Sequence, residues 1–363
     1  MTSIEQGSAA DVAALDDWGK LTQMSVEGLR GCAEIFCPTN FWEPGVTKLL
    51  LEMNTKGLGS FKSWPQASSW FYPLYGNGFT NKTIKEIAAL AVELNPKANA
   101  SYVAGHLSGG WEARRDFDAV RLAWDQELWP FDLEQFGESL VGKPPQRYRL
   151  TNEDGMAWGR AYLNYLLCLA GLSRHVSAPP SRFLEIGGGF GVLGEIVMSR
   201  DPEAVYVDLD IPPLLTVATY YLTELFGKDR IGSFNAPQFQ TPGSFACDQS
   251  AVLPNWRVDD LLGKFDVFVN SFSFQEMEPN VVEHYAAAVA AKEVTYVVSL
   301  NSRDGKKRAT EAGSRGVLDP VTSTRIAEIF SKLGYELVGR YGSPLLRGAG
   351  ELIILRRGAV QGV

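Results

Sequence analysis

The segment Phe183 to Val197, FLEIGGGFGVLGEIV, decides the fold of this chain. It places five glycines within the eight positions 187–194, between two apolar runs. Glycines let a backbone turn sharply and approach a ligand closely. A helix that follows such a turn offers unpaired N–H groups and the positive end of its dipole. The segment therefore predicts a strand over 182–186, a ligand-binding turn and a helix over 191–199.

Two cofactor motifs overlap in this turn. Positions 189–194 (GFGVLG) match the GxGxxG fingerprint of dinucleotide-binding enzymes. Positions 185–191 (EIGGGFG) match the ExGxGxG pattern of enzymes that bind S-adenosylmethionine (SAM). Glu185 favours SAM, because a carboxylate there suits the ammonium group and sulfonium surroundings of SAM and has no task beside a pyrophosphate. An NAD(P)-dependent oxidoreductase is the alternative.

An acidic residue at the end of the next strand supports a ribose-bearing cofactor in both interpretations. Asp210 lies 19 residues beyond Gly191, where a carboxylate can accept hydrogen bonds from ribose hydroxyls. Asp208 points to the same side of that strand and is the second candidate. The cofactor-binding candidates of this region are Glu185, Gly187, Gly188, Gly189, Gly191, Asp208 and Asp210.

From Arg182 onward, short β-branched runs alternate with helical patterns, which indicates βαβ units and a largely parallel sheet. Strands are expected over 204–210, 265–270, 294–300, 335–340 and 351–356, and a third strand is poorly marked between 231 and 252. The last two resemble a hairpin, whereas a dinucleotide enzyme continues with a second βαβαβ half. The sequence thus predicts an α/β fold with the Rossmann-like, seven-stranded sheet of class I SAM-dependent methyltransferases.

The part before residue 150 has a different composition. Eight of the nine tryptophans lie at or before Trp158. Apolar spacing near 3.6 predicts helices over 11–29 and 80–94, and the second can be capped by Thr80 or Asn81. A structured loop over 57–78 and a long helix over 152–172 are also expected. We therefore expect a helical, aromatic-rich region over 1–150 that covers the pocket of a methyltransferase domain over 151–363.

The bulk composition narrows the class of protein. The net charge is −8, without a large basic cluster, which argues against nucleic acid as a partner. No apolar run approaches the roughly 20 residues that span a bilayer, and the first 20 residues lack the features of a signal peptide. The four cysteines are scattered, and no acidic or histidine cluster has compelling metal-ligand spacing. We expect a cytoplasmic enzyme that acts on a small molecule, with no metal site nominated and with metal dependence and a homodimer left open.

Three segments together resemble the sugar O-methyltransferases of bacterial natural-product gene clusters. They are EIGGGFG at 185–191, DLDIPPLLTVATYYL at 208–222 and NSFSFQEM at 270–277. The resemblance implies methyl transfer from SAM to a hydroxyl of a sugar or of a glycosylated or polyketide natural product. Class I enzymes often carry an acidic residue after strand three, beside the adenine, and Asp248 is the position that matches. A catalytically silent SAM-binding protein is an alternative of another class.

The segment that follows the fourth strand carries the first catalytic candidates. Substrates of open α/β sheets bind beyond the carboxyl ends of the strands, and Asn270 begins the segment at that edge, as a further cofactor contact. Glu276 is the candidate base for an acceptor hydroxyl, and Gln275 can orient that hydroxyl. The competing interpretation is that Gln275 and Glu276 only cap the following helix.

Two histidines and one arginine complete the candidates. His284 falls about two turns past Glu276 in an expected helix. His106 lies in a glycine-rich stretch, expected as a loop, from which a base could reach the site from the other domain. The basic segment 301–317 follows strand five at the same sheet edge, and it is either a solvated loop or a lid whose Arg303 contacts the substrate.

Overall fold

The computed structural model describes residues 17–124, 133, 136–151, 155–311, 313–343, 346 and 349–358. The α-helices are α1 (Asp17–Gly31), α2 (Glu43–Lys56), α3 (Ala67–Trp70), α4 (Asn81–Leu94), α5 (Ala100–Ser108), α6 (Gly110–Ala123), α7 (Arg160–Ser173), α8 (Val192–Arg200), α9 (Leu214–Phe226), α10 (Pro237–Gln240), α11 (Pro279–Ala291) and α12 (Ser323–Lys332). The strands are β1 (Arg182–Ile186), β2 (Val205–Asp210), β3 (Gly232–Ser233), β4 (Phe245–Ala246), β5 (Ala251–Pro254), β6 (Leu261–Leu262), β7 (Val267–Ser271), β8 (Tyr296–Ser302), β9 (Tyr335–Tyr341) and β10 (Gly350–Arg357).

One large sheet organises the described part of the chain, in the strand order β3-β5-β2-β1-β7-β8-β10-β9. All neighbours up to β8 are parallel, whereas β10 runs antiparallel to both β8 and β9. The chain moves outward from β1 in one direction through β2 and β5, and then in the other direction through β7 and β8. The gap between β1 and β7 is therefore the topological switch point, at whose carboxyl edge open α/β sheets bind ligands.

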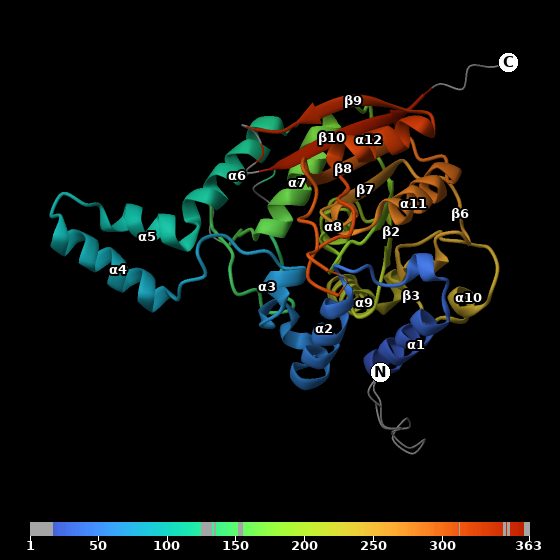
Figure 1. Ribbon diagram of the computed structural model, residues 1–363, viewed down its shortest axis with the longest axis horizontal. Coiled ribbons are helices and arrows are strands. Elements are labelled where there is room, and N and C mark those ends of the chain that lie inside the picture. Colours follow the sequence, from blue (N-terminus) through green and yellow to red (C-terminus); the bar gives the residue numbers. More distant parts are fainter. Residues whose placement is uncertain are drawn as a thin grey trace.

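Helices cover both faces of this sheet (Figure 1). Right-handed crossovers that step in opposite directions place their helices on opposite faces. On one side α8 packs between α7 and α9, and on the other α11 packs against α12. The strands between the two layers are nearly continuous apolar runs, and all six residues of β2 are buried, as expected for a sheet covered on both faces.

The N-terminal region lies over the carboxyl edge of the sheet. Its helix α1 packs against α9, and the short 3₁₀-helix η3 (Leu58–Ser63) packs against both α2 and α9. Phe61 and Phe71 from this region contact Phe190, which follows the glycine turn, with ring centroids 5.6 and 6.2 Å apart. Buried side chains of both regions belong to one hydrophobic core. The division at residue 150 stays a prediction.

The strands that the sequence predicts are present within about two residues of their expected ends, and β1 matches at both ends. Thr80 caps α4 as expected, since its Oγ1 accepts a hydrogen bond from the N–H of Thr83 at 3.2 Å. Three predictions differ from the structure. The sheet has eight strands, not seven, because the two-residue β3 pairs with β5 at its edge. The long helix expected from 152 begins only at Arg160, and the stretch around His106 is the helix α5, not a loop. The poorly marked third strand is β5, whose four residues are all buried.

Two further features concern the helices. Helices α4 and α5 form a hairpin that projects from the body of the molecule (Figure 1). Within the described residues, no helix has both the length and the hydropathy needed to cross a bilayer.

Candidate functional site

The glycine turn after β1 brings backbone close to two side chains of the sheet edge. Gly187, Gly189 and Gly191 have φ angles of 74°, 70° and 87°, a region that favours glycine. A Cβ atom on Gly187 would lie 2.6 Å from the Oγ of Ser273, and one on Gly188 would lie 2.7 Å from the Oδ1 of Asp208. The turn therefore needs glycine at 187 for both conformation and space, and at 188 for space.

The two aspartates of β2 accept hydrogen bonds from the backbone of this turn. The N–H of Gly188 donates to Asp208 Oδ1 at 3.1 Å, and the N–H of Gly189 donates to Asp210 Oδ2 at 2.8 Å. Asp208 is fully buried and its Oδ2 has no hydrogen-bond partner among the described residues. Burial raises the pKa of Asp210 to about 7 and holds the pKa of Asp208 well above its ordinary value. Asp208 therefore supports the loop, whereas Asp210 also lines the cavities described below.

Glu185 does not face a cavity with its carboxylate. Both of its oxygens are occupied, since the hydroxyls of Tyr165 and Tyr206 each donate to one at 2.7 Å. Burial raises the pKa of Glu185 to about 7. Tyr165 itself lines the main cavity. The structure thus places Glu185 behind Tyr165, where it orients the wall of the site.

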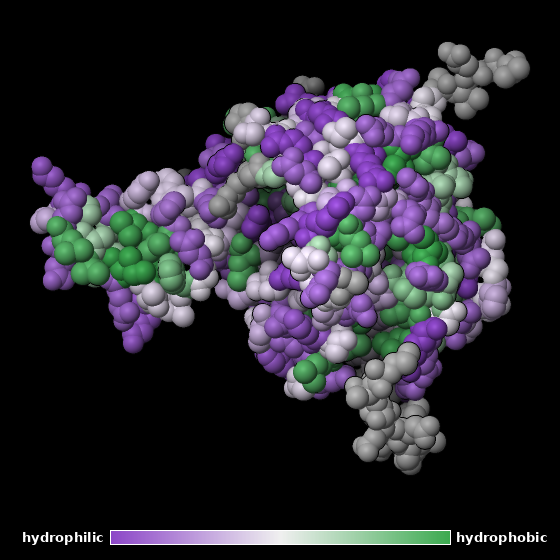
Figure 2. All heavy atoms as spheres, in the orientation of Figure 1, coloured by the Kyte–Doolittle hydropathy of each residue, from purple (hydrophilic) through white to green (hydrophobic). Residues whose placement is uncertain are grey.

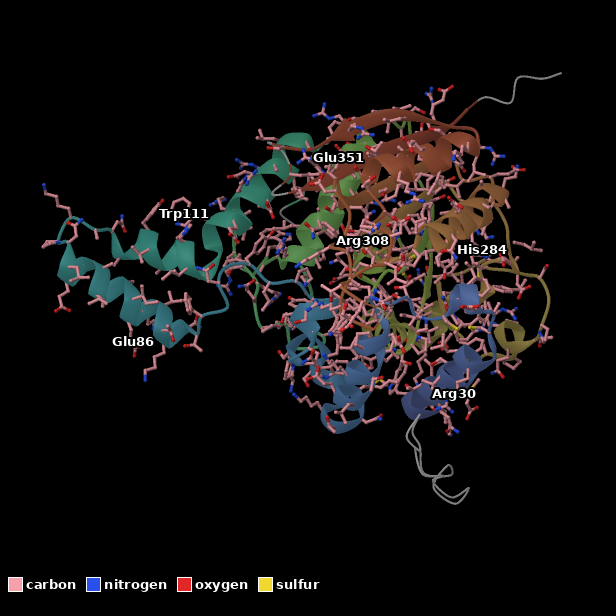
Figure 3. All side chains as sticks on the ribbon, in the orientation of Figure 1. Arg30, Glu86, Trp111, His284, Arg308 and Glu351 are labelled. Atoms are coloured by element: carbon pink, nitrogen blue, oxygen red, sulfur yellow. The ribbon has the colours of Figure 1, made fainter. Side chains whose placement is uncertain are left out.

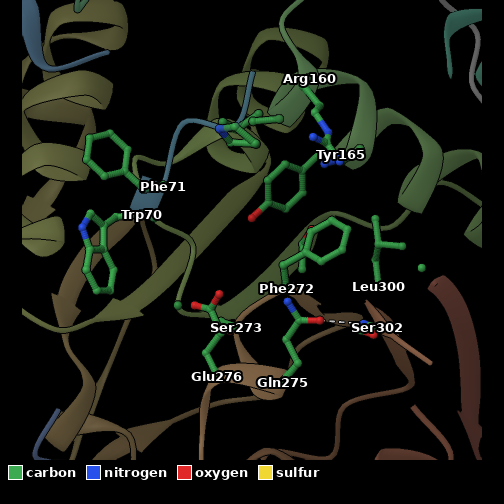
Figure 4. A pocket seen from close by; sticks show the side chains of 18 of the residues that line it. Trp70, Phe71, Arg160, Tyr165, Phe272, Ser273, Gln275, Glu276, Leu300 and Ser302 are labelled. Atoms are coloured by element: carbon green, nitrogen blue, oxygen red, sulfur yellow. Dashed lines mark hydrogen bonds between the residues drawn. The ribbon is translucent and has the colours of Figure 1, made fainter. Parts of the chain in front are cut away.

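Two cavities meet at this turn. The larger, of about 690 Å³, lies between the carboxyl edge of the sheet and the N-terminal region, and Figure 4 shows part of its lining. The smaller, of about 40 Å³, lies beyond β2 and is covered by Cys37, Pro38 and Thr39. Gly187 and Asp210 line both cavities. A ligand that filled both would therefore pass over the glycine turn and the Asp210 carboxylate.

The small cavity contains a buried acceptor with no partner. Asn255 follows β5 and is 4% exposed, and its amide nitrogen donates to the carbonyl oxygen of Phe36 and to the hydroxyl of Tyr285, both at 2.8 Å. Its Oδ1 has no hydrogen-bond partner among the described residues. An orphaned buried acceptor is costly and calls for a ligand or a water. Asp248, which was expected near here, is exposed, precedes β5 and lines neither cavity.

A buried polar network joins the ends of β7 and β8 under the main cavity. Asn270 Nδ2 donates to the carbonyl oxygen of Ile186 at 3.1 Å, and Asn270 Oδ1 accepts from Asn301 Nδ2 at 2.9 Å. The Gln275 side-chain oxygen accepts from the N–H of Ser302 at 2.7 Å, which directs the amide nitrogen into the cavity (Figure 4). Asn270 therefore links the glycine turn to the neighbouring strands, and Gln275 presents a donor.

Glu276 stands beside Gln275 in the same cavity, and Figure 4 shows its carboxylate directed inward. One oxygen accepts from the indole N–H of Trp42 at 3.0 Å, and the other lies 2.8 Å from the ammonium nitrogen of Lys306. Burial raises the pKa of Glu276, and the nearby Lys306 opposes that rise. Glu276 is thus a buried carboxylate with fixed orientation at the cavity wall.

Segment 36–42 connects this carboxylate to the rest of the site. Thr39 donates to the carbonyl oxygen of Glu276 at 2.7 Å. Asn40 binds the loop after β8, because its amide nitrogen donates to the carbonyl oxygens of Ser314 and Gly316 at 2.9 Å, and its oxygen accepts from the N–H of Gly313. The basic loop therefore lies against the N-terminal region and closes one side of the cavity.

That loop contributes residues other than the one expected. Lys306 and Lys307 line the cavity, whereas the side chain of Arg303 is 56% exposed and lies 3.7 Å from Asp304. Arg315 donates to the carbonyl oxygen of Ser69 at 2.9 Å and covers the Trp70 ring at 5.0 Å from its centroid. Lys306 and Trp42 are thus the functional candidates that sequence reasoning missed.

Phe272 has an unusual backbone for its residue type. It lines the main cavity with a φ of 62°, and its N–H donates to the carbonyl oxygen of Leu300 at 2.7 Å. A left-handed conformation at a bulky residue costs about 1–3 kcal/mol and is found mainly at functional sites. The turn after β7 is therefore a second constrained element of this edge.

The structure does not bring the candidate histidines to either cavity. His106 is exposed on α5, in the projecting hairpin. His284 lies on α11, 3.2 Å from Asp259, on the side of the body away from that hairpin (Figure 3). In the described part of the chain, no three His, Cys, Asp or Glu side chains are grouped so as to hold a metal ion.

The order of the sheet and its antiparallel β9–β10 finish define the Rossmann-like class I methyltransferase fold, preceded by a helical N-terminal region, and so confirm the predicted fold. No protein-family model matches the chain, and no curated protein matches it.

Solved structures with some likeness include that of the mitomycin 7-O-methyltransferase MmcR, at 13% identity and a TM-score of 0.37, covering 97% of this chain and 76% of that one. The pyocyanin biosynthetic protein PhzM is 15% identical with a TM-score of 0.36, and the match covers 54% of this chain and 58% of PhzM, little more than half its length. The magnesium protoporphyrin IX methyltransferase of Synechocystis PCC 6803 with bound SAM is 10% identical with a TM-score of 0.38, covering 55% and 79%. These likenesses are too distant to assign a function.

Proposed function

We propose that this protein is a SAM-dependent methyltransferase that methylates a hydroxyl group of a small molecule. The observation that carries the proposal is the position of Asp210, between the glycine turn and the two cavities. A ribose there would direct the base toward the small cavity and the aminoacyl chain into the main cavity.

The residues of the site fit SAM group by group. Asp210 would accept hydrogen bonds from the ribose hydroxyls, as acidic residues at the end of the second strand do. The orphaned Oδ1 of Asn255 would accept from the exocyclic amine of adenine. Because the small cavity now has room for about one water molecule, segment 37–39 has to move outward to admit the ring. The aminoacyl group would lie in the main cavity along 187–189 and Tyr165.

SAM supplies an electrophilic methyl group, and the protein has to align the acceptor and remove its proton. Glu276 is the group proposed to take that proton, since its carboxylate is buried, oriented by Trp42 and open to the cavity. The side-chain oxygen of Gln275 is held by Ser302, so its amide N–H, which has no partner in the described part of the chain, would bind the acceptor oxygen. Ordinary capping does not account for these positions, because both side chains line the cavity.

The acceptor class is inferred from the walls of the cavity. Trp70, Phe71 and Phe272 present aromatic surface, and such rings suit the apolar faces of a sugar or of a polyketide. The polar groups opposite them suit a molecule with several hydroxyls. A glycosylated or polyketide natural product fits this combination, which agrees with the resemblance of 185–191, 208–222 and 270–277 noted above.

The test combines calorimetry with a mass-detected transfer assay on a panel of sugar, phenol and amine acceptors. The full chain is expected to bind SAM and to methylate a hydroxyl-bearing acceptor. Asp210→Asn should weaken SAM binding, because the amide cannot accept from both ribose hydroxyls as a carboxylate does. Glu276→Gln should keep SAM binding and lower kcat by about 10² to 10⁴, the usual contribution of a general base.

Other outcomes would replace the proposal. Binding of NAD(P) without binding of SAM would make the protein an oxidoreductase. SAM binding without a product on any acceptor would favour a silent SAM-binding protein. Methylation confined to amines would keep the cofactor assignment and change the acceptor.

A further inference from the structure

The projecting hairpin is hereafter called the α4–α5 arm and comprises residues 79–111. Helix α4 packs against α5, and α5 packs against α6, which joins the arm to the body. Figure 1 shows α4 and α5 standing clear of the sheet and of its covering helices. Only Ile84 and Ala88 of α4 are buried, and no residue of α5 is. The arm therefore has almost no core of its own.

Much of the exposed apolar surface of the molecule lies on this arm. Five of the twelve large hydrophobic side chains exposed in the described part of the chain belong to it, namely Phe79, Leu90, Leu94, Tyr102 and Trp111. Figure 2 shows hydrophobic residues gathered on one face of the arm, with hydrophilic residues along its edges. Their summed exposed area is on the order of 500 Å², the size of the largest apolar patch on a typical monomer, and such patches are often functional.

The arm also carries an exposed pair of aromatic side chains, Tyr102 and Trp111, that contact each other. Tyr102 is 58% exposed and Trp111 is 52% exposed, and their ring centroids lie 5.6 Å apart. Gly105 makes this possible, because a Cβ atom there would lie 2.7 Å from the indole nitrogen of Trp111. Tyrosine and tryptophan that are rigid and half-exposed are the usual centres of protein interfaces.

A second stripe of α4 lies beside the buried Ile84 and Ala88 and becomes exposed toward the end of the helix. Thr83, Ile87, Leu90 and Leu94 follow one another at spacings of four, three and four residues, which is the heptad spacing of a helix–helix seam. The inner stripe of Ile84 and Ala88 already contacts α5. Helix α4 is therefore apolar on two sides, and a two-helix hairpin of this length is marginal in water without a further partner.

We propose that the α4–α5 arm is the surface through which two copies of this chain associate, each arm packing on the other to form a four-helix bundle. Two-fold pairing of identical arms would bury both patches, on the order of 1,000 Å² in total, which is the least area expected of a biological interface. The arm carries Lys82, Lys85 and Lys97 together with Glu86 and Glu93, so its charge is nearly balanced. Lys82 and Glu93 stand near opposite ends of α4, which suits an antiparallel pair of these helices.

Charge also distinguishes this occupant from the main alternative. A helix that binds the surface of a membrane carries a strongly basic polar face. The polar side of α4 mixes both signs, and Lys82 is paired with Glu86 at 3.8 Å. A second copy is therefore the partner that the arm fits.

Sedimentation velocity on the full chain tests the proposal over a range of micromolar concentrations. The wild-type chain is expected to be a dimer. The double variant Leu94→Glu with Tyr102→Glu should raise the dimer dissociation constant at least roughly 30-fold, as loss of interface hot spots does. Hydrogen exchange of residues 81–108 should rise on dilution of the wild-type chain and be fast in the variant at every concentration.

Leu51→Glu is the matched control, because Leu51 is 64% exposed on α2, outside the arm, and it should leave the dimer intact. Circular dichroism of each variant reports on its folding. A wild-type monomer at 100-fold the concentration used for exchange would overturn the proposal, as would a double variant that remains a dimer. Binding of the wild-type chain to phosphatidylcholine–phosphatidylserine vesicles through the arm, without self-association, would replace the second copy by a membrane.

Discussion

Glu276 combines burial with two donors, and this sets its expected behaviour with pH. Burial raises the pKa of its carboxyl above the ordinary value of about 4.3. Lys306, whose ammonium nitrogen lies 2.8 Å away, limits that rise by favouring the charged form. The proposed base is therefore active above the pH at which an ordinary glutamate ionises, and kcat should fall as the carboxylate is protonated.

Lys306→Met is expected to move the acid limb of the kcat–pH profile to higher pH. Without the cation, the buried carboxylate is harder to ionise, so a higher pH is needed for the active form. Lys307→Met is the matched control, since Lys307 lines the same cavity but no contact with Glu276 is present among the described residues. An unchanged limb in Lys306→Met, or a limb that moves to lower pH, would contradict the role given to Glu276.

Some residues of the candidate site could be predicted from the sequence and others could not. Asp210 could be placed from its distance to Gly191, because strand and turn lengths in a βαβ unit are nearly fixed. Asn255 could not, since the third strand was poorly marked and an acidic residue, Asp248, stood nearby. A neutral side chain at this position becomes visible as a candidate only when its acceptor is found buried and without a partner.

At the scale of elements, a buried ionic cluster joins η3 to α8 and α9. Lys62 is fully buried, 2.8 Å from Glu138, and its nitrogen also lies 3.1 Å from the Tyr221 hydroxyl. That hydroxyl donates to Glu195 at 2.6 Å. The cluster therefore connects the N-terminal region to α8 and α9, the first two helices after the glycine turn.

Lys62→Met should lower the free energy of unfolding by about 3–5 kcal/mol, because removal of one partner leaves a buried charge uncompensated. The loss should be larger at pH 8 than at pH 5. Burial raises the pKa of Glu195 to about 7, so at pH 5 this carboxyl is protonated. The stability that comes from the raised pKa is lost as the pH rises through 7. Lys62 favours the charged form of Glu195 that is then present, so the loss of Lys62 costs more at pH 8.

Urea denaturation at both pH values measures this effect. The control is Lys228→Met, which breaks the exposed pair with Asp17 at 3.1 Å and should cost less than about 1 kcal/mol. Equal losses in the two variants would show that the cluster does not hold the elements together.

The helices and strands could be predicted from the sequence more easily than the contacts between them. The period of apolar residues predicts each strand and helix from its own segment, and the glycine turn predicts where the first strand ends. The pairing of Trp42 with Glu276 joins residues 234 positions apart, and no local pattern carries that information. The helices α4 and α1 could be predicted, but not the surfaces against which they pack.

At the scale of the whole molecule, the N-terminal region completes the site. Segment 36–42 contacts Asn255 of the small cavity through Phe36, the proposed base through Thr39 and Trp42, and the loop after β8 through Asn40. The proposed position of adenine in the small cavity requires this segment to move. Cofactor binding should therefore change the protection of backbone amides well beyond the glycine turn.

Hydrogen exchange with S-adenosylhomocysteine should show added protection in 36–42 and in 313–316 as well as in 187–191. Asn40→Ala should abolish the protection of 313–316 and keep that of 187–191, because the loop loses its three hydrogen bonds to the segment. Asn54→Ala, an exposed position on α2, is the control. Protection confined to 187–191 in the wild-type chain would mean that the three parts move independently.

Phe272 has a consequence for how this protein can be improved or can evolve. Its left-handed backbone would be relaxed by glycine or asparagine, and the same change would remove an aromatic wall of the cavity. Selection for heat resistance alone would accept that change, whereas selection for turnover would reject it. At position 272 the changes that raise stability are thus expected to lower turnover. Libraries built for thermostability should leave this position unaltered.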